Sequence, residues 1–397
     1  MTKSATAPTM TNPATAPRSA VQRLLSLDVV RGITIAFMIM VNNNGGPGSW
    51  RFMNHAEWNG LTPTDLVFPT FAFVIGVSIV FAFSARLAKG TSRGELARHT
   101  VQRAIILIIF GIIVNSFPFF HLAHMRFYGV LQRLAICYLV VGLLYLYDQR
   151  ASTKWVALAA ALVGYWVLVR WVPIPGVGMP GRDVPFMDMD QNLVSWIDRH
   201  IFPHHLYLYP PDHIGRDPEG LLSGLPALGT TLMGVLAGIW LRTSRSVKAK
   251  TAGLAVASLC SLAVGYLWSL EFPLNKNMWT SSFVLVAGGY SLALLTVCFW
   301  AVEQMNWRKG WTYVWVVFGS NAIAAYMFSE LAPGILYNIT TTAPNGRKVS
   351  VVESFFRSTL AHIPDPGWAA FTYSVLFCAF CFIPVWILYK KKIFLKI

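Results

Sequence analysis

Residues 65–85 read DLVFPTFAFVIGVSIVFAFSA and give the clearest indication of the architecture. After its first residue this run is apolar except for a few hydroxyl groups. About 20 such residues are enough for a helix to cross the hydrocarbon core of a bilayer. A backbone in lipid must satisfy its own hydrogen bonds, and barrel strands are shorter and alternate in polarity. The run therefore predicts a transmembrane helix.

The whole chain has the composition of a membrane protein. Of its 397 residues, 55% are hydrophobic and only 12% are charged, against about 25% charged in a soluble domain. This composition excludes a soluble enzyme and a disordered chain. We predict an all-α, polytopic membrane helical bundle with about ten transmembrane helices. The apolar segments lie near 27–43, 65–85, 101–118, 128–147, 154–172, 221–241, 250–270, 280–301, 311–333 and 368–390.

The distribution of positive charge predicts the orientation. If the N-terminus is cytoplasmic, 20 of the 32 Lys and Arg residues fall on the cytoplasmic side, which favours a bundle with both termini inside. The net charge of +15 then reflects topology, and we expect no nucleic-acid partner. An integral protein of the bacterial inner (cytoplasmic) membrane, with lipid as a partner, fits these features.

The chain divides into two regions. We expect residues 1–24 to form a disordered cytoplasmic tail, because they are rich in Thr, Ala, Pro and Ser. Residues 25–397 should form the transmembrane domain. Its long outer loops are 44–64, 173–220 and 334–367, and long loops beside a bundle usually carry function.

The outer segment 42–69 is the richest in polar residues that suit chemistry. A histidine accepts a proton near neutral pH, so His55 is a candidate general base. The Asn44 amide could donate to a developing oxyanion. Asp65 suits a helix N-terminus as the third residue after Thr62, and the alternative is that Asp65 orients His55, as Glu57 could also do. The competing interpretation of the segment is a solvated loop.

Polar residues in and beside the apolar segments indicate two further sites. Arg31 and Arg103 lie near the cytoplasmic face, where they could attract the phosphates of an anionic cofactor or simply reach lipid phosphate. Arg31 also lies three residues after Asp28 and could pair with it.

A second group of polar residues is a candidate outer pocket. Asp217 and Pro218 predict a helix start, and Glu219 could favour that start or bind a sugar. Helix packing and interface anchoring are the competing explanations for several members of the group. The pocket candidates are Arg133, Glu219, Asn275, Lys276 and Asn321.

The histidines of the second outer loop predict no metal site. His200, His204, His205 and His213 have a spacing that fits no zinc signature. Cys378 and Cys381 lie one turn apart in an apolar segment without partner ligands, so we interpret them as packing residues.

Several motifs together resemble one family, the heparan-α-glucosaminide N-acetyltransferases. The resemblance covers nearly all of the chain after residue 25, and its first motif is long and specific. Its residues are LDVVRG at 27–32, VNNNGG at 41–46, NHAEWNGLT at 54–62, DLVFP at 65–69, YGVLQR at 128–133, DPEGLL at 217–222 and NKNMW at 275–279.

The resemblance implies a transmembrane acyltransferase. Members of the family move an acetyl group from cytosolic acetyl-CoA to the amine of a terminal glucosamine on the far side of the membrane. The family's active-site histidine falls on His55 and a functional asparagine falls on Asn44. On this basis we expect His55, Asn44 and Asp65 to be catalytic.

The remaining expectations concern ligands and mechanism. We expect Arg31, Arg103 and Asn43 to bind acetyl-CoA, and Glu57 to join the outer pocket that holds the acceptor. His55 could act as a base for direct transfer or could itself carry the acetyl group, and both routes stay open. The chain could form a homodimer. An amino-sugar transporter or channel without acyl transfer is the alternative function.

Overall fold

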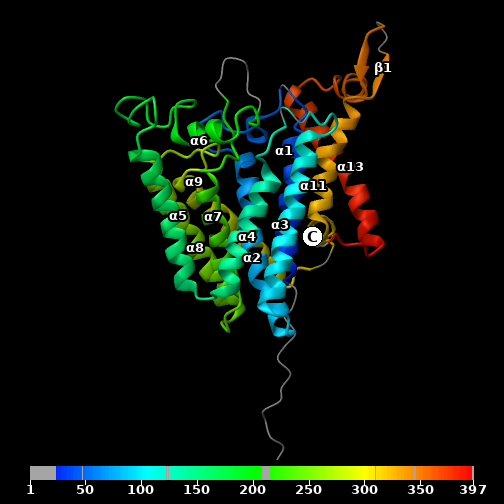
Figure 1. Cartoon of the computed structure of the whole chain (residues 1–397). Helices are drawn as coiled ribbons and strands as arrows, with labels where there is room; N and C mark the ends of the chain where they lie inside the picture. Colours follow the sequence, from blue (N-terminus) through cyan, green and yellow to red (C-terminus); the bar gives the residue numbers. More distant parts are fainter. Residues whose placement is uncertain are drawn as a thin grey trace, which may run out of the picture.

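The computed structural model describes residues 24–395 except 47, 122, 124, 208–214, 309 and 343–345. The predicted tail 1–24 therefore lies almost entirely outside the described residues. The described chain is a helical bundle, and a short antiparallel hairpin is its one sheet (Figure 1). The elements are α1 Leu25–Asn42, η1 Arg51–Met53, η2 Pro63–Leu66, α2 Val67–Ala88, α3 Arg93–Ser116, α4 Val130–Tyr147, α5 Ala151–Trp171, α6 Leu193–Ile201, α7 Gly224–Leu241, α8 Val247–Trp268, α9 Ser281–Phe299, η4 Trp300–Gln304, α10 Thr312–Ser320, α11 Ala322–Leu336, β1 Thr340–Thr342, β2 Lys348–Ser350, α12 Val351–Phe355, η5 Phe356–Leu360 and α13 Pro366–Lys390.

The predicted all-α membrane bundle is confirmed. Within the described residues, nine helices are long and apolar enough to cross a membrane, and a bent pair of helices brings the number to ten if it counts as one span. The nine are α1, η2 with α2, α3, α4, α5, α7, α8, α9 with η4, and α13.

The ninth predicted span, 311–333, is not one continuous helix. The chain breaks between α10 and α11 and turns by 80°. Asn321 occupies the break with a non-helical backbone, and its side-chain amide donates to the Ile393 carbonyl and accepts from the Leu395 N–H. Because these bonds tie the break to the segment after α13, the polar residue in mid-span serves to join two parts of the chain.

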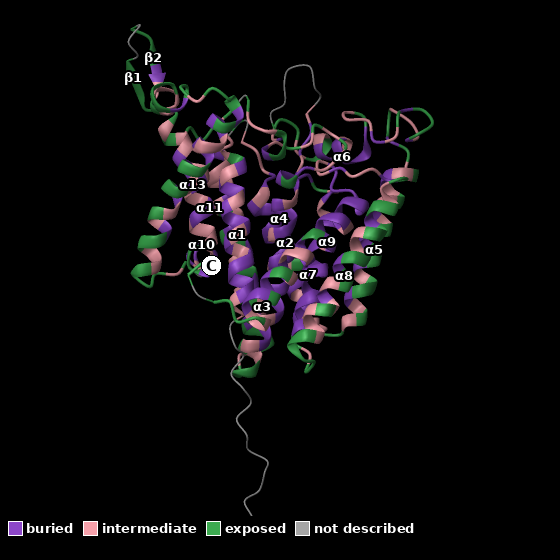
Figure 2. Ribbon diagram, turned by 180° about the vertical axis from the view of Figure 1, so that it is seen from behind, coloured by how far each residue is buried: buried purple, intermediate pink, exposed green. Residues whose placement is uncertain are grey.

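Helices α1, α2, α7 and α9 form the interior of the bundle, and α3, α5, α8 and α13 cover it. Figure 2 shows this contrast, because the inner helices are largely buried and the outer ones expose their far faces. The inner helices approach closely at small residues, as is common in membrane proteins. At Gly76 of α2 an added Cβ would lie 2.0 Å from the Thr231 carbonyl oxygen of α7.

The long connections gather at one end of the bundle, the end where α1 finishes (Figure 1). The α1–α2 loop, the α5–α7 connection with α6, and the α11–α13 connection with the β1–β2 hairpin all lie there. The polar residues of three distant parts of the sequence can therefore meet at this end.

Replacing Gly76 by Ala should lower the stability of the bundle. The new methyl group cannot fit 2.0 Å from a backbone oxygen, so α2 and α7 must separate, at a cost of about 1–3 kcal/mol. Thermal unfolding in detergent measures this loss. Gly164→Ala in α5 is the matched control, because nothing lies within 4 Å of its added Cβ. Equal stability of the two variants would contradict the close α2–α7 crossing.

Candidate active site

The His55 loop is fixed by asparagines and by a glycine. The Asn44 amide donates to Asn54 Oδ1 at 2.8 Å, and its own oxygen accepts from the Gly46 N–H. Gly45 has a φ of 78°, and an added Cβ would lie 2.6 Å from the Cα atom of Ala370. Only glycine allows this conformation and this approach to α13. The loop therefore presents His55 from a defined position.

Asp65 performs both of the roles that the sequence suggested. Its Oδ2 atom accepts hydrogen bonds from the backbone N–H groups of Thr62 and Ala56, at 3.0 and 3.1 Å. Together with the Thr62 side chain this forms a capping box at the start of η2, with Pro63 as the first helical residue. Its Oδ1 atom lies 2.7 Å from Nδ1 of His55. Because a carboxylate accepts, Nδ1 donates in this bond, and Nε2 is the ring nitrogen that Asp65 does not engage.

The two partners differ in exposure. The side chain of His55 is 50% exposed and that of Asp65 is 1% exposed. A substrate can therefore reach the imidazole, whereas Asp65 can act only through it. This is the arrangement of a histidine base oriented by a buried acid.

Lys276 approaches His55 from a loop more than two hundred residues away in the sequence. Its Nζ atom lies 3.1 Å from Nδ1 and 3.2 Å from Nε2 of the ring. Burial lowers the pKa of Lys276, and the carboxylates of Glu219 and Asp65 oppose that change. The structure thus brings together two predicted site residues, His55 and Lys276, and extends the group toward Glu219.

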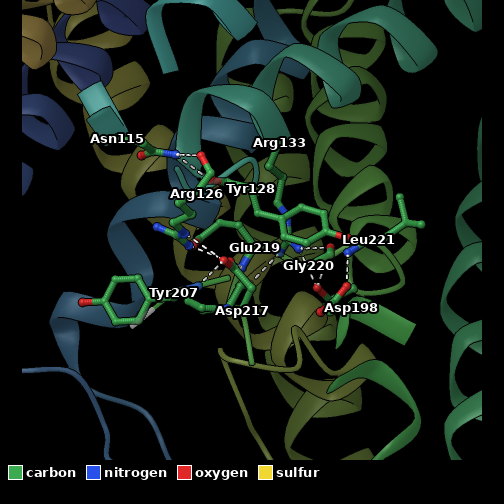
Figure 3. Close-up of polar contacts among 12 residues, drawn as sticks. Asn115, Arg126, Tyr128, Arg133, Asp198, Tyr207, Asp217, Glu219, Gly220 and Leu221 are labelled. Atoms are coloured by element: carbon green, nitrogen blue, oxygen red, sulfur yellow. Dashed lines mark hydrogen bonds and ion pairs between the residues drawn. The ribbon is translucent and has the colours of Figure 1, made fainter. Parts of the chain in front are cut away.

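A buried ion cluster lies beside this group (Figure 3). Arg126 donates from Nε to Asp217 Oδ2 at 2.7 Å, and from Nη2 to Asp217 Oδ1 and to Glu219 Oε2. The Tyr207 ring lies 4.8 Å from the guanidinium carbon. Asp217 pairs with Arg126 instead of capping a helix, and α7 begins only at Gly224, so the predicted helix start at Asp217 and Pro218 is wrong.

Arg133 holds the segment that carries the two acids. Its guanidinium donates to the carbonyls of Pro218 and Gly220, at 3.2 and 2.6 Å, and to the Ser223 hydroxyl. Its face lies over Trp279, 5.2 Å from the ring centroid. With these donors occupied, Arg133 fixes the backbone of residues 218–223.

Asp198 of α6 supports the same segment from its other side (Figure 3). Its Oδ1 atom accepts from the Leu221 N–H at 2.8 Å, and Gly220 packs directly against its carboxylate. Burial raises the pKa of Asp198 to about 7, and the nearby charge of Asp217 adds to this effect. Asp198 therefore takes up a proton near neutral pH.

A cavity of about 830 Å³ runs through the bundle between α1, α2, α3, α4 and the α10–α11 pair. Its inner end, where α2 finishes and α3 begins, is lined by Arg31, Arg86, His99, Arg103 and one acid, Glu95, so that positive charge predominates there. Arg103 Nε is buried there and has no hydrogen-bond partner among the described residues. The inner end thus offers positive charge and an unused donor to an anion.

The outer end of the cavity finishes next to the ion cluster. It reaches Val130, the first residue of α4, and Tyr326 of α11. Tyr326 lies within electrostatic reach of Glu219 and Arg126. His55 and Lys276, both described, are not among the residues that line the cavity.

The other predicted residues lie in different places. Asn275 lies beside Lys276. Its side-chain amide donates to Asn59 Oδ1, and its side-chain oxygen accepts from the Met278 N–H. Glu57 is exposed on the His55 loop. Asn43 lies at the end of α1, and its side-chain amide donates to the Ile39 carbonyl. The structure separates Asn321 from the outer group, because Gly319, two residues before it, packs against Asp28 on the first turn of α1.

Two further predictions can be compared with the structure. The predicted Asp28–Arg31 pair is confirmed at 3.2 Å, and Arg31 also donates to Ser78. Among the described residues there is no group of His, Cys, Asp and Glu that could hold a metal ion, and His213 lies outside them.

Sequence reasoning missed Arg126 and Asp198 as members of the site. Asp198 is one of seven acids in the second outer loop, and nothing in the pattern singles it out. Arg126 carried a weak signal, because it stands two residues before Tyr128 on the outer side, where basic residues are fewer.

Comparisons with known proteins identify the family of the chain. The model of the family described as "Heparan-alpha-glucosaminide N-acetyltransferase, catalytic" matches residues 23–269. The Homo sapiens protein named heparan-alpha-glucosaminide N-acetyltransferase is 30% identical over 355 residues, which are 78% of this chain and 53% of that protein. The Mus musculus protein of the same name is 26% identical over 427 residues, 96% of this chain and 61% of that protein. The chain thus spans less than two thirds of the length of either relative.

Replacing Arg126 by Met should strongly destabilise the outer end of the bundle. The carboxylates of Asp217 and Glu219 would stay buried without their partner, which costs about 3–5 kcal/mol. Thermal unfolding measures the loss. Arg182→Met breaks an exposed ion pair with Asp183 and should change stability by no more than about 1 kcal/mol. A large effect of both variants, or of neither, would contradict the special role of burial.

The D198N variant should gain stability relative to the wild type as pH rises. The folded state keeps a proton on Asp198 up to about pH 7, whereas the unfolded chain loses it near the ordinary pKa of 3.8. The wild type therefore loses stability across this window as pH increases, and the amide removes that loss. Thermal unfolding at about pH 5 and about pH 8 should show an advantage for the D198N variant that grows by at least about 1 kcal/mol. A constant difference would argue against a raised pKa.

Proposed function

The chain belongs to the heparan-α-glucosaminide N-acetyltransferase family, and from this we propose that it is a membrane acetyltransferase that moves an acetyl group from acetyl-CoA to the amine of an amino sugar. The observation that carries the proposal is His55, half exposed at the loop-rich end and bonded through Nδ1 to the buried Asp65. A thioester and an amine need such a base, because an ammonium cannot attack a carbonyl.

The cavity suits acetyl-CoA as co-substrate. Arg31, Arg86 and Arg103 line its inner end and can bind phosphate groups, and the free Nε donor of Arg103 fits that purpose. The middle is lined mainly by apolar side chains, which suit a slender acyl-carrying arm. To reach His55 the thioester passes the ion cluster at the outer end. Asn43 stays a candidate for the same ligand near the end of α1.

The orientation follows from the same basic residues. We place the cavity's arginine-lined end in the cytoplasm and the His55 loop on the outer side of the bacterial inner membrane, with both termini inside. The donor then enters from the cytoplasm and the acceptor from outside. Glu219, Glu57, Asn275 and Lys276 lie on the side where the acceptor arrives, and Glu219 can bind an ammonium or a hydroxyl group.

The residues support a direct transfer. The amine nitrogen forms a bond to the acetyl carbon, its proton moves to Nε2 of His55, and the C–S bond breaks to release CoA, which takes up the proton as a thiol. Asp65 stabilises the imidazolium that forms. Attack by Nε2 itself would give an acetyl-histidine, and exchange of labelled CoA into acetyl-CoA without acceptor identifies that route.

Asn44 stays a candidate oxyanion donor. In this conformation its amide donates to Asn54, the neighbour of His55, so that role requires the amide to leave this bond. Until then Asn44 fixes the position of the His55 loop.

His55→Ala should lower acetyl transfer by about 10²–10⁴-fold, because the proton acceptor is gone. Purified protein, labelled acetyl-CoA and a panel of amino sugars, read by mass spectrometry, measure the rate. His362→Ala, in an exposed stretch of another outer loop, is the control and should keep full activity. Unchanged transfer in His55→Ala would refute the assignment of the base.

The same preparation tests the competing function. An amino-sugar transporter would also need a cavity across the bundle, but it would consume no acetyl-CoA. Uptake of an unmodified amino sugar by wild-type vesicles, without acetylated product from any sugar of the panel, would contradict the acetyltransferase.

A further inference from the structure

Lys276 is held against His55 by contacts between two loops. The Gly60 N–H donates to the Leu274 carbonyl at 2.8 Å, and the Asn275 amide donates to Asn59 Oδ1 at 3.1 Å. These bonds join the loop before α9 to the His55 loop directly beside both side chains. The position of Lys276 is therefore built into the fold, although it lies beyond the residues matched by the family model.

The imidazole has a negative group on one side and a positive group on the other. Asp65 Oδ1 lies 2.7 Å from Nδ1, and Lys276 Nζ lies 3.1 Å from the same atom and 3.2 Å from Nε2. The carboxylate favours a protonated ring and the ammonium opposes it.

Other charges around Lys276 also have both signs. Glu219 and Asp65 face it with negative charge, and Arg126 and Arg133 with positive charge. The carboxylates favour the ammonium form of Lys276. An ammonium so close to the ring works against a second positive charge on the imidazole.

We propose that Lys276 is a positioning residue that keeps the His55 imidazole neutral until an acceptor amine arrives. The inference rests on the assignment of His55 as the base in the proposed function. A base that was already protonated could not accept the amine's proton. After transfer, the ammonium also favours release of the proton from His55 to the departing thiolate.

The test measures the ionisation of His55 without using acyl transfer. Diethylpyrocarbonate modifies the neutral form of a histidine and not its protonated form. Peptide mass spectrometry gives the modification rate of each histidine as a function of pH. The variants are K276M, K276Q and K276R, with D65N as the opposite change. The exposed His362 reports in the same samples as an internal reference.

In K276M and K276Q the pH midpoint for His55 modification should rise by about one unit, because the opposing charge is lost. K276R keeps the charge and should keep the midpoint near that of the wild type, and D65N should lower it. The midpoint of His362 should not move. The acidic limb of the pH–rate profile for acetyl transfer should follow the His55 midpoint in each variant.

Unchanged His55 midpoints in both K276M and K276Q would overturn the proposal. Thermal unfolding identifies any variant that fails to fold. If K276M fails to fold, K276Q, which is close to Lys in size, provides the test instead. If the midpoint shifts as expected but the wild type acetylates no amino sugar, the proposed function fails while the charge effect stands. A shift of the acidic limb without a shift in modification would also contradict the role of Lys276.

Discussion

The position of the candidate base depends on one carboxylate. Asp65 is buried at the start of α2, where a helix leaves backbone N–H groups without partners and the surrounding membrane protein supplies little water. One oxygen accepts from the N–H groups of Thr62 at this helix start and of Ala56 beside His55, and the other oxygen holds the His55 ring. The imidazole therefore takes its orientation from a rigid helix rather than from the loop that carries it. A site held in this way can be half exposed to its substrate and still be well defined.

Charge pairing between distant segments completes the outer end. Arg126 and Arg133 come from the approach to α4 and from its first turn, and together they hold the segment 217–223 through ion pairs and carbonyl contacts. These bonds differ from surface ion pairs, because Arg133, Asp217 and Glu219 are buried and the side chain of Arg126 is only 18% exposed. The same interactions therefore order the loops at the end of the bundle that carries His55.

Whether the sequence could predict an interaction depended on how far apart its partners lie along the chain. Lipid imposes a local requirement on every span, so hydropathy predicted the bundle. The capping box at Thr62 and Asp65 and the Asp28–Arg31 pair are also local and were confirmed. The break at Asn321 depends on the segment after α13, the Arg126–Asp217 pair spans 91 residues, and the Lys276–His55 contact spans 221. No periodicity or spacing encodes these pairings, so the sequence suggested only that such residues needed partners.

The division of the cavity into a charged end and an apolar middle bears on the chemistry. A thioester is open to hydrolysis wherever water and a base meet it, and the middle of the cavity offers mainly hydrocarbon side chains such as Ile35, Val74 and Leu134. The candidate base His55 does not line the cavity. A donor held along the cavity would thus meet His55 only when its acetyl end leaves the cavity. Keeping the imidazole apart from a waiting thioester works against transfer to water before the acceptor amine arrives.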